Sequence, residues 1–331
     1  MPPDRRLRLG EDTRFASEAA SSPRTGWGGR SIERAVKLVF TENMHALMLP
    51  KGHKFPLGKY DRIHGALSAE FPGTLLLGAP ASVSDLELVH EPSYVAAVRD
   101  GTLDDTRVRR LGFPWSESLV TRATRSVGGT LAALSWAMEL GAAGHMAGGT
   151  HHAFRDRGEG FCVFNDLAVA AKVAMRDHGV KKVAIVDLDV HQGNGTASIF
   201  QDDPRVFTLS LHGARNYPFQ KEQSSLDVGL PDACDDATYL AALDAALEHV
   251  RAFRPDLVFY QSGVDALTGD RLGRMDLTLA GLSVRDARVF GMVRALGVPL
   301  VTTLGGGYGR DIEPTIRAHV EVFRGLMRTF G

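Results

Sequence analysis

The sequence predicts a single-domain α/β protein, built on a mostly parallel β-sheet that is flanked by helices on both faces. Three observations support this fold class. Short runs rich in β-branched residues alternate with longer amphipathic segments from residue 34 onward. Most of the short runs are apolar on both faces, which is typical of buried parallel strands. Neither a repeat nor a linker interrupts this alternation, so one domain is the simpler organisation.

The individual elements follow from these runs in chain order. Strands are expected over residues 36–41, 183–189, 206–211, 256–262 and 298–304, where β-branched side chains favour extended backbone. Helices are expected over residues 117–140, 166–178, 236–253, 278–296 and 313–328. The pairs Asn165–Asp166 and Asp235–Asp236 stand at helix starts, where a side-chain oxygen can accept from an unpaired backbone N–H.

Composition and charge restrict the partners of the chain. Its 331 residues include 38 basic and 39 acidic ones, and this balance predicts no nucleic-acid partner. No run approaches the roughly eighteen apolar residues of a membrane span. Cys162 and Cys234 are too few for a disulfide framework or a cysteine-rich zinc site, so we expect a reducing, cytoplasmic setting. The sequence leaves the oligomeric state open.

The first 30 residues differ from the rest of the chain. They are rich in arginine and serine, but they also contain Asp4, Glu11, Asp12 and Glu18, whereas transit peptides are poor in acidic residues. We therefore expect residues 1–30 to form a loosely ordered arm and residues 31–331 to form the domain.

Polar side chains cluster just after the expected strands, and ligands of open parallel sheets bind beyond the carboxyl ends of strands. A lone Asp or His at such a place is more often a cap or a solvated loop residue. Four segments contribute such groups in this chain, which makes chance assembly improbable. The side chains are His151, His152, Asp187, Asp189, His191, Asp265 and, after three glycines, Tyr308.

Asp189, His191 and Asp265 make a mixed oxygen and nitrogen ligand set. Three protein ligands leave a position open for water, as in catalytic zinc sites. The set is rich in carboxylates, so Fe²⁺ is an alternative to Zn²⁺. Such an ion activates water near neutral pH and polarises a substrate carbonyl.

The tandem histidines are then expected to handle protons beside the metal. Asp187 and Asn194 flank the metal segment and can fix the tautomers of His151 and His152. Tyr308, on its glycine-rich turn, can donate a hydrogen bond to a developing oxyanion.

These segments resemble the zinc-dependent histone deacetylase superfamily, which has the arginase/deacetylase fold of about eight strands. The matching stretches are GGTHHAFRDRGEGFCVFND (residues 148–166), VDLDVHQGNGT (186–196), SGVDALTGDRLG (262–273) and GGGYG (305–309). Residues 41–60 and 212–231 look most like the class IV branch and its bacterial relatives. The resemblance covers roughly residues 34–331, so the domain over residues 31–331 is expected to be catalytic.

The resemblance implies roles for individual residues. Asp189, His191 and Asp265 match the zinc ligands, and Tyr308 matches the oxyanion tyrosine. His152 matches the general base and acid, and His151 its electrostatic partner, hydrogen-bonded to Asp187. Asn194 stands where some members have Asp, and a neutral partner raises the pKa of an imidazole less than a carboxylate does.

The resemblance also implies a tunnel for the substrate and a second ion. The tunnel residues are Gly160, Phe161, Tyr217, Leu272 and Gly306, with core packing as the plainer role of the two aromatic ones. Asp187 and Ser210 match ligands of a structural K⁺ site.

The implied function is the removal of acetyl or longer acyl groups from lysine side chains of a peptide or protein, by metal-activated water. Deacetylation of acetylpolyamines or other small acylated amines is the alternative, and acidic residues at the tunnel mouth would favour it. A catalytically silent scaffold is the third reading, although none of the site residues is missing. A binuclear, arginase-like site is disfavoured because Asp265 is followed by ALTGD, which lacks the Asp-x-Asp pattern.

Overall fold

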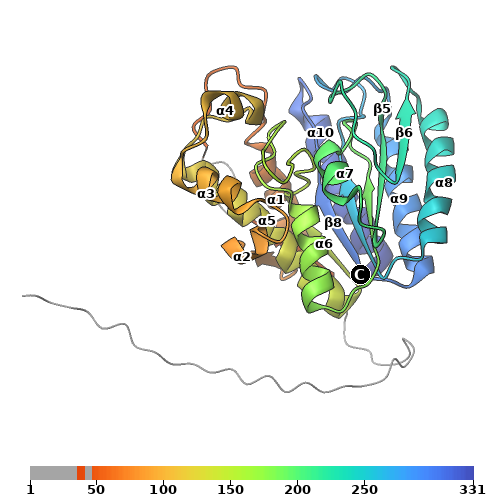
Figure 1. The fold of residues 1–331 in the computed structure, drawn as a ribbon. Helices are drawn as coiled ribbons and strands as arrows, with labels where there is room; N and C mark the ends of the chain where they lie inside the picture. The colour runs from red at the N-terminus through yellow and green to blue at the C-terminus, as the bar shows by residue number, and fades with distance from the viewer. Residues whose placement is uncertain (1–35, 42–46) are drawn as a thin grey trace, which may run out of the picture. The chain divides into compact units, whose positions relative to one another are not determined.

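One parallel sheet of eight strands organises the computed structural model, which describes residues 36–41 and 47–331 (Figure 1). The strand order is β2-β1-β3-β8-β7-β4-β5-β6, and every neighbouring pair is parallel. The strands are β1 (Lys37–Phe40), β2 (Leu75–Leu77), β3 (Ala142–His145), β4 (Val183–Asp187), β5 (Val206–Gly213), β6 (Leu226–Leu230), β7 (Leu257–Ser262) and β8 (Leu300–Leu304). The predicted α/β class and the strand number are confirmed.

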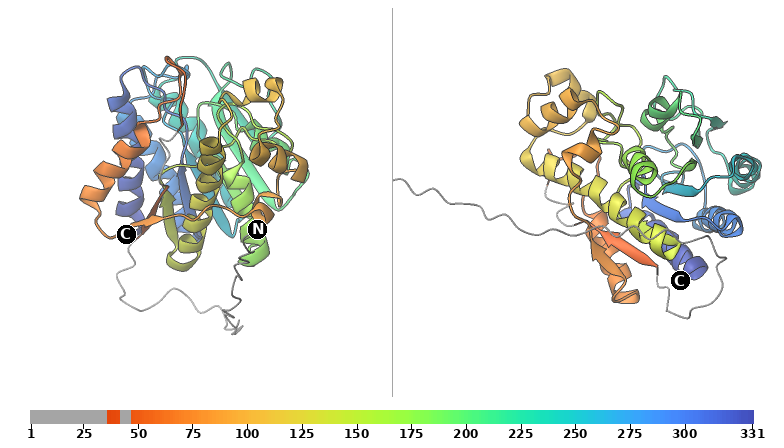
Figure 2. Two further views of the ribbon diagram at one scale, coloured as in Figure 1. Left: turned by 90° about the vertical axis from the view of Figure 1, so that its left-hand side faces the viewer. Right: turned by 60° about the horizontal axis from the view of Figure 1, so that its bottom comes forward.

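Helices cover both faces of this sheet, and a separate apolar core lies between the sheet and the helices on each face. They are α1 (Lys59–Glu70), α2 (Val83–Leu86), α3 (Pro92–Asp100), α4 (Asp105–Leu111), α5 (Glu117–Leu140), α6 (Asp166–Asp177), α7 (Asn194–Phe200), α8 (Asp236–Phe253), α9 (Leu279–Leu296) and α10 (Ile312–Phe330). Buried residues of α1, α8, α9 and α10 belong to one core, and those of α2 to α7 belong largely to the other. Figure 2 shows α1 beside α10, although the two are far apart in the sequence.

Most predicted elements agree with the structure to within two residues. Helices α5 and α8 have the predicted bounds, and Asn165 and Asp235 are the N-caps of α6 and α8. Strands β2, β3 and β6 were not predicted, and neither were α1 to α4 or α7. These elements are short, or they lack the β-branched runs and the clear helical period on which the prediction relied. Because β3 was not predicted, no predicted strand directly preceded the histidine pair.

The predicted arm over residues 1–30 lies outside the described residues. The described residues, 36–41 and 47–331, belong to one compact unit. Within residues 36–41 and 47–331, no helix combines the length and apolar character needed to cross a membrane.

The topology brings the four site segments to one edge of the sheet. The tandem histidines follow β3, the Asp–His segment follows β4, Asp265 follows β7 and the glycines follow β8. These four strands are the adjacent central strands β3-β8-β7-β4. Their carboxyl ends therefore meet, as expected for the ligand site of an open parallel sheet.

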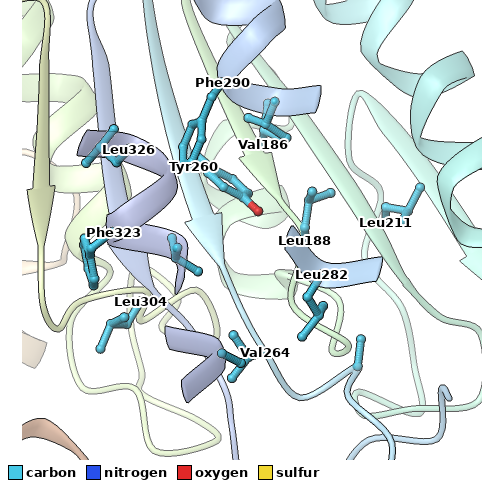
Figure 3. Close-up of a cluster of buried hydrophobic side chains, with 14 of the residues drawn as sticks. Val186, Leu188, Leu211, Tyr260, Val264, Leu282, Phe290, Leu304, Phe323 and Leu326 are labelled. Atoms are coloured by element: carbon cyan, nitrogen blue, oxygen red, sulfur yellow. The ribbon is translucent and has the colours of Figure 1, made fainter. Parts of the chain in front are cut away.

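The core beneath this edge anchors the site (Figure 3). Val186, Val264 and Leu304 are almost fully buried, and each lies directly before a site residue in the chain. Tyr260 of β7 packs edge-to-face on Phe290 of α9, with ring centroids 5.8 Å apart. Truncating a buried Phe of this kind to Ala costs about 3–5 kcal/mol. The site loops thus emerge from tightly packed strand ends.

Candidate metal centre and active site

Asp189, His191 and Asp265 form a buried cluster that can hold a metal ion. One ligand atom from each lies within 4.8 Å of the others. His191 Nδ1 is 2.9 Å from Asp189 Oδ1 and 3.1 Å from Asp265 Oδ2. Asp265 Oδ2 has no hydrogen-bond partner among the described residues, although it is buried. A buried carboxylate oxygen without a donor fits a cation at this point.

The pKa values support the same conclusion. Burial, and next the charge of Asp189, raise the pKa of Asp265 to about 7. Burial lowers the pKa of His191, but its contacts with the two carboxylates outweigh this effect and raise that pKa to about 10. The two carboxylates therefore favour a positive charge at this position, which is a proton on His191 when no metal ion is bound. One imidazole and two carboxylates are a ligand set that fits a divalent ion.

Gly306, which the resemblance places in the tunnel, also lies against the cluster of Asp189, His191 and Asp265. Its N–H donates to Asp189 Oδ2 at 2.5 Å, and the residue also lines the inner of two cavities. A Cβ at this position would lie 1.8 Å from Asp265 Oδ2. Only glycine allows the backbone to approach the two carboxylates this closely.

His151 is paired with a carboxylate. Its Nδ1 donates to Asp187 Oδ2 at 2.6 Å, and both side chains are buried. Burial lowers the pKa of His151, but the Asp187 charge and hydrogen bond outweigh it and leave the pKa raised. His151 is therefore biased toward its charged form.

His152 has a neutral partner. Its Nδ1 lies 2.7 Å from Asn194 Oδ1, and an amide oxygen only accepts, so Nδ1 carries the proton. Burial, and next the positive charges of His151 and His191, hold the pKa of His152 well below its usual value. Its Nε2 is thus an unprotonated base at neutral pH.

The loop that carries both histidines is held by Asp166, the first residue of α6. Asp166 Oδ1 accepts from the N–H and the hydroxyl of Thr150 at 2.7 and 2.6 Å. Asp166 Oδ2 accepts from Gly149 N–H at 3.1 Å and from the Thr130 hydroxyl at 2.6 Å. From the sequence, Asp166 was expected only at a helix start, as part of a cap. The sequence did contain a signal for this role. Asn165 already caps α6, so the adjacent carboxylate of Asp166 was free to bind another segment.

Two cavities meet at the reacting groups. The inner one has a volume of about 50 Å³ and the outer one about 550 Å³. Five residues contribute to the lining of both cavities, namely His152, Gly160, Phe161, His191 and Tyr308. His191, a candidate metal ligand, therefore lies with His152 and Tyr308 at the junction of the outer and inner cavities.

Gly160 lets the His152 ring occupy this passage. Its φ is +53°, in the left-handed region that favours glycine. A Cβ there would lie 2.6 Å from Cδ2 of His152. The neighbouring Phe161 has φ of +69° and faces Tyr308, with ring centroids 6.3 Å apart.

Tyr308 is a protonated donor at this passage. Burial, and next the charges of Asp189 and Asp265, raise its pKa well above the usual value. Lys59, missed in the sequence analysis, lies over its ring at 5.6 Å and donates to Gly305 O at 3.1 Å. Lys59 lies on α1, an element that the prediction did not include.

Tyr217 and Leu272 line the outer cavity, as predicted for the tunnel. Asn216 Nδ2 donates to Leu272 O at 2.7 Å, which ties the two segments together. The Tyr217 hydroxyl donates to Glu159 Oε2 at 2.9 Å, and its ring lies 5.0 Å from that of His152. Tyr217 therefore lies against His152, and Leu272 is held at the same cavity through Asn216.

Asp187 and Ser210, the predicted K⁺ ligands, are register partners in β4 and β5. Ser210 Oγ lies 3.0 Å from His212 Nδ1. Asp187 and Ser210 line neither of the two cavities.

The family is identified by comparison with known proteins. The Histone deacetylase domain model matches residues 53–323. The chain belongs to the histone deacetylase family. Histone deacetylase 2 of Arabidopsis thaliana is 33% identical over 297 residues, which are 85% of this chain and 76% of that protein.

Three further proteins are similar to this chain. An uncharacterised protein of Picosynechococcus is 45% identical over 82% of this chain and 92% of its own. The acetoin utilization protein AcuC of Bacillus subtilis is 31% identical over 73% of this chain and 69% of its own. The solved HDA15 HD domain superposes with a TM-score of 0.75 at 28% identity, over 89% of this chain and 88% of that one.

Proposed function

We propose that this chain is a metal-dependent amidohydrolase that removes acyl groups from lysine side chains. The observation that carries the proposal is the passage between the two cavities, where His152, His191 and Tyr308 meet. The relatives named as histone deacetylases support the same reaction class.

Asp189, His191 and Asp265 would hold the ion, with Zn²⁺ as our first choice, as in the family, and Fe²⁺ as the alternative. When bound there, the ion supplies Lewis acidity, which lowers the pKa of water and polarises a carbonyl. Asp187 and Ser210 would hold K⁺ at the floor of the site.

The proton transfers belong to His152. Its free Nε2 accepts a proton from the attacking water and later donates it to the nitrogen of the leaving amine. The products are a carboxylate and a free lysine amine. His151, biased toward its charged form by Asp187, stabilises negative charge next to this base.

Tyr308 and the aromatic wall position the substrate. The Tyr308 hydroxyl, which stays protonated, donates to the oxygen that becomes negative during attack. Phe161 and Tyr217 would enclose the aliphatic part of the lysine side chain in the outer cavity.

The mouth disfavours the polyamine alternative. The outer cavity is lined by five cationic side chains, namely Lys54, Arg110, Arg215, Arg271 and Arg274. Among the described residues, no Asp or Glu lines it. A polycationic substrate would be repelled here, so a peptide or protein substrate is favoured.

The inner cavity favours a short acyl group. Its volume of about 50 Å³ is room for roughly four water molecules. An acetyl group fits such a space, and a fatty acyl chain requires several times more.

Two free cysteines agree with the cytoplasmic setting that we propose.

A kinetic panel on the zinc-loaded protein tests the proposal. It compares acetyl-, octanoyl- and myristoyl-lysine peptides with acetylspermidine. We expect acetyl-lysine to be hydrolysed fastest and turnover to collapse in Tyr308→Phe and His152→Ala. Absence of turnover for every substrate would contradict the proposed function, and preference for acetylspermidine would contradict its substrate class.

A further inference from the structure

The charge at the mouth is local and not a property of the whole chain. The formal net charge is −1, so a distant anion feels little attraction from the molecule as a whole. The five cationic side chains that line the outer cavity nevertheless come from four separate segments, around residues 54, 110, 215 and 271–274.

Nearby carboxylates do not neutralise this set. Arg215 and Arg274 share Asp232, at 3.5 and 3.2 Å. Arg110 lies 3.6 Å from Glu159, which also binds the guanidinium of Arg157 at 2.9 Å.

Asp270 lies next to Arg271, but its carboxylate is occupied elsewhere. Its Oδ1 accepts from the N–H groups of Leu272 and Gly273, and its Oδ2 accepts from Tyr308 N–H. Among the described residues, Lys54 and Arg271 have no carboxylate within ion-pair distance.

Arg271 is also fixed in place. Its Nε donates to Tyr308 O at 2.8 Å, and one Nη donates to Lys54 O at 2.9 Å. An arginine held by two backbone carbonyls loses little side-chain freedom when it binds an anion, because its orientation is already set. The carbonyl of Tyr308 places this guanidinium at the opening of the passage to the reacting groups.

We propose that Lys54 and Arg271 select substrates that carry a carboxylate on the amine side of the scissile amide. This inference rests on the proposed function, since it assumes that the lysine backbone remains in the outer cavity while the acyl group passes inward. Acidic residues beside an acyl-lysine supply such a carboxylate, and so does the α-carboxylate of a single acyl-lysine.

Binding, measured apart from turnover, tests this selection. The full-length His152→Ala protein is titrated by fluorescence anisotropy with acetyl-lysine peptides flanked by Glu, Ala or Lys. We expect the Glu-flanked peptide to bind at least tenfold more tightly than the Lys-flanked one in 0.1 M salt. The difference should shrink in 1 M salt, where the Debye length falls from about 10 Å to about 3 Å.

Substitutions of the two cationic residues, compared with a charge reversal elsewhere, identify the residues responsible. Lys54→Glu, at an exposed side chain, should reduce the Glu-over-Lys preference at least threefold, and Arg271→Gln should also reduce it. Arg294→Glu makes the same type of reversal in the last turn of α9, near the opposite end of β8. It should leave the preference unchanged.

A competition experiment and the hydrolysis of a neutral peptide distinguish the remaining alternatives. Competition by Nα-benzoyl-Nε-acetyl-lysine, with its carboxylate free or amidated, distinguishes a single amino acid from an acidic peptide as the source. Equal affinities for the three peptides, or tighter binding of the Lys-flanked one, would overturn the inference. Failure of wild-type protein to hydrolyse even the Ala-flanked peptide would refute the proposed function, and the binding order would still decide the inference.

Discussion

Two adjacent histidines in one loop have different hydrogen-bond partners. His151 faces the carboxylate of Asp187 at 2.6 Å, and His152 faces the amide of Asn194 at 2.7 Å. The pKa of His151 is raised, and that of His152 is held well below its usual value. The pKa values of these neighbouring residues, whose rings are 4.1 Å apart, are thus shifted in opposite directions.

With these two partners, one loop can supply both a charge and a base. Two protonated imidazoles at this distance would repel each other, so the protonation of one disfavours that of the other. The carboxylate partner determines which of them carries the charge. The neutral partner leaves Nε2 of His152 free to accept a proton.

The largest effect is expected from His152→Ala, because it removes the proposed base and acid. General acid–base catalysis contributes about 10²- to 10⁴-fold, so kcat should fall about a thousandfold. Steady-state kinetics on an acetyl-lysine peptide measures the loss. An equal loss in His151→Ala, with the same pH dependence, would mean that the two histidines do not have separate roles.

Asp187→Asn makes the two pairs chemically alike. The pKa of His151 should fall, since the charge that offsets its burial is gone. We expect kcat/KM to fall about 10- to 100-fold through loss of the electrostatic partner. Titration of His151 by NMR checks the cause, and an unchanged His151 pKa would contradict it.

Thr150→Val disturbs both pairs equally by weakening the support of their loop. The Thr150 hydroxyl donates toward Phe164 O and Asp166 Oδ1 and accepts from Asp166 N–H. We expect a loss of about 1–2 kcal/mol in the free energy of unfolding, with a several-fold loss of kcat. Urea denaturation measures the first value.

Thr329→Val is the control for that variant, since its hydroxyl has one bond, to Gly325 O near the end of α10. It should cost less stability and leave kcat unchanged. A shift of the pH profile in Thr150→Val would show that the loop does more than support the two histidines.

Asn194→Asp makes the pairs alike in the opposite sense and has the smallest effect on rate. A carboxylate raises the pKa of His152, and the base works only when unprotonated. The acidic limb of the kcat/KM profile should therefore move to higher pH by about one unit, while kcat above pH 8 changes less than threefold. An unmoved limb would show that this limb does not report His152.

The sequence was sufficient for those parts of the site whose chemistry is local. Asp189 and His191 lie two positions apart after an apolar run, and strand ends of a parallel sheet bring them to Asp265. The central strands β4, β7 and β8 were recognisable from β-branched residues. Strand β3 has the sequence AAGH, which carries no such signal.

Contacts between distant segments were beyond the reach of sequence patterns. Arg271 reaches the backbone of Lys54, 217 positions away, and Lys59 reaches Gly305, 246 positions away. The cationic mouth likewise arises only when four segments fold together, because the overall charge is close to zero. Such features depend on tertiary packing and leave no local period or spacing.

The most direct test of the two-histidine account is an NMR pH titration of the imidazole nitrogens, assigned by single His→Gln substitutions, in the zinc-loaded protein. At pH 7 we predict that His151 is protonated on both nitrogens, and that His152 is neutral with its proton on Nδ1. A doubly protonated His152 at pH 7, or a proton on its Nε2, would contradict its role as the base.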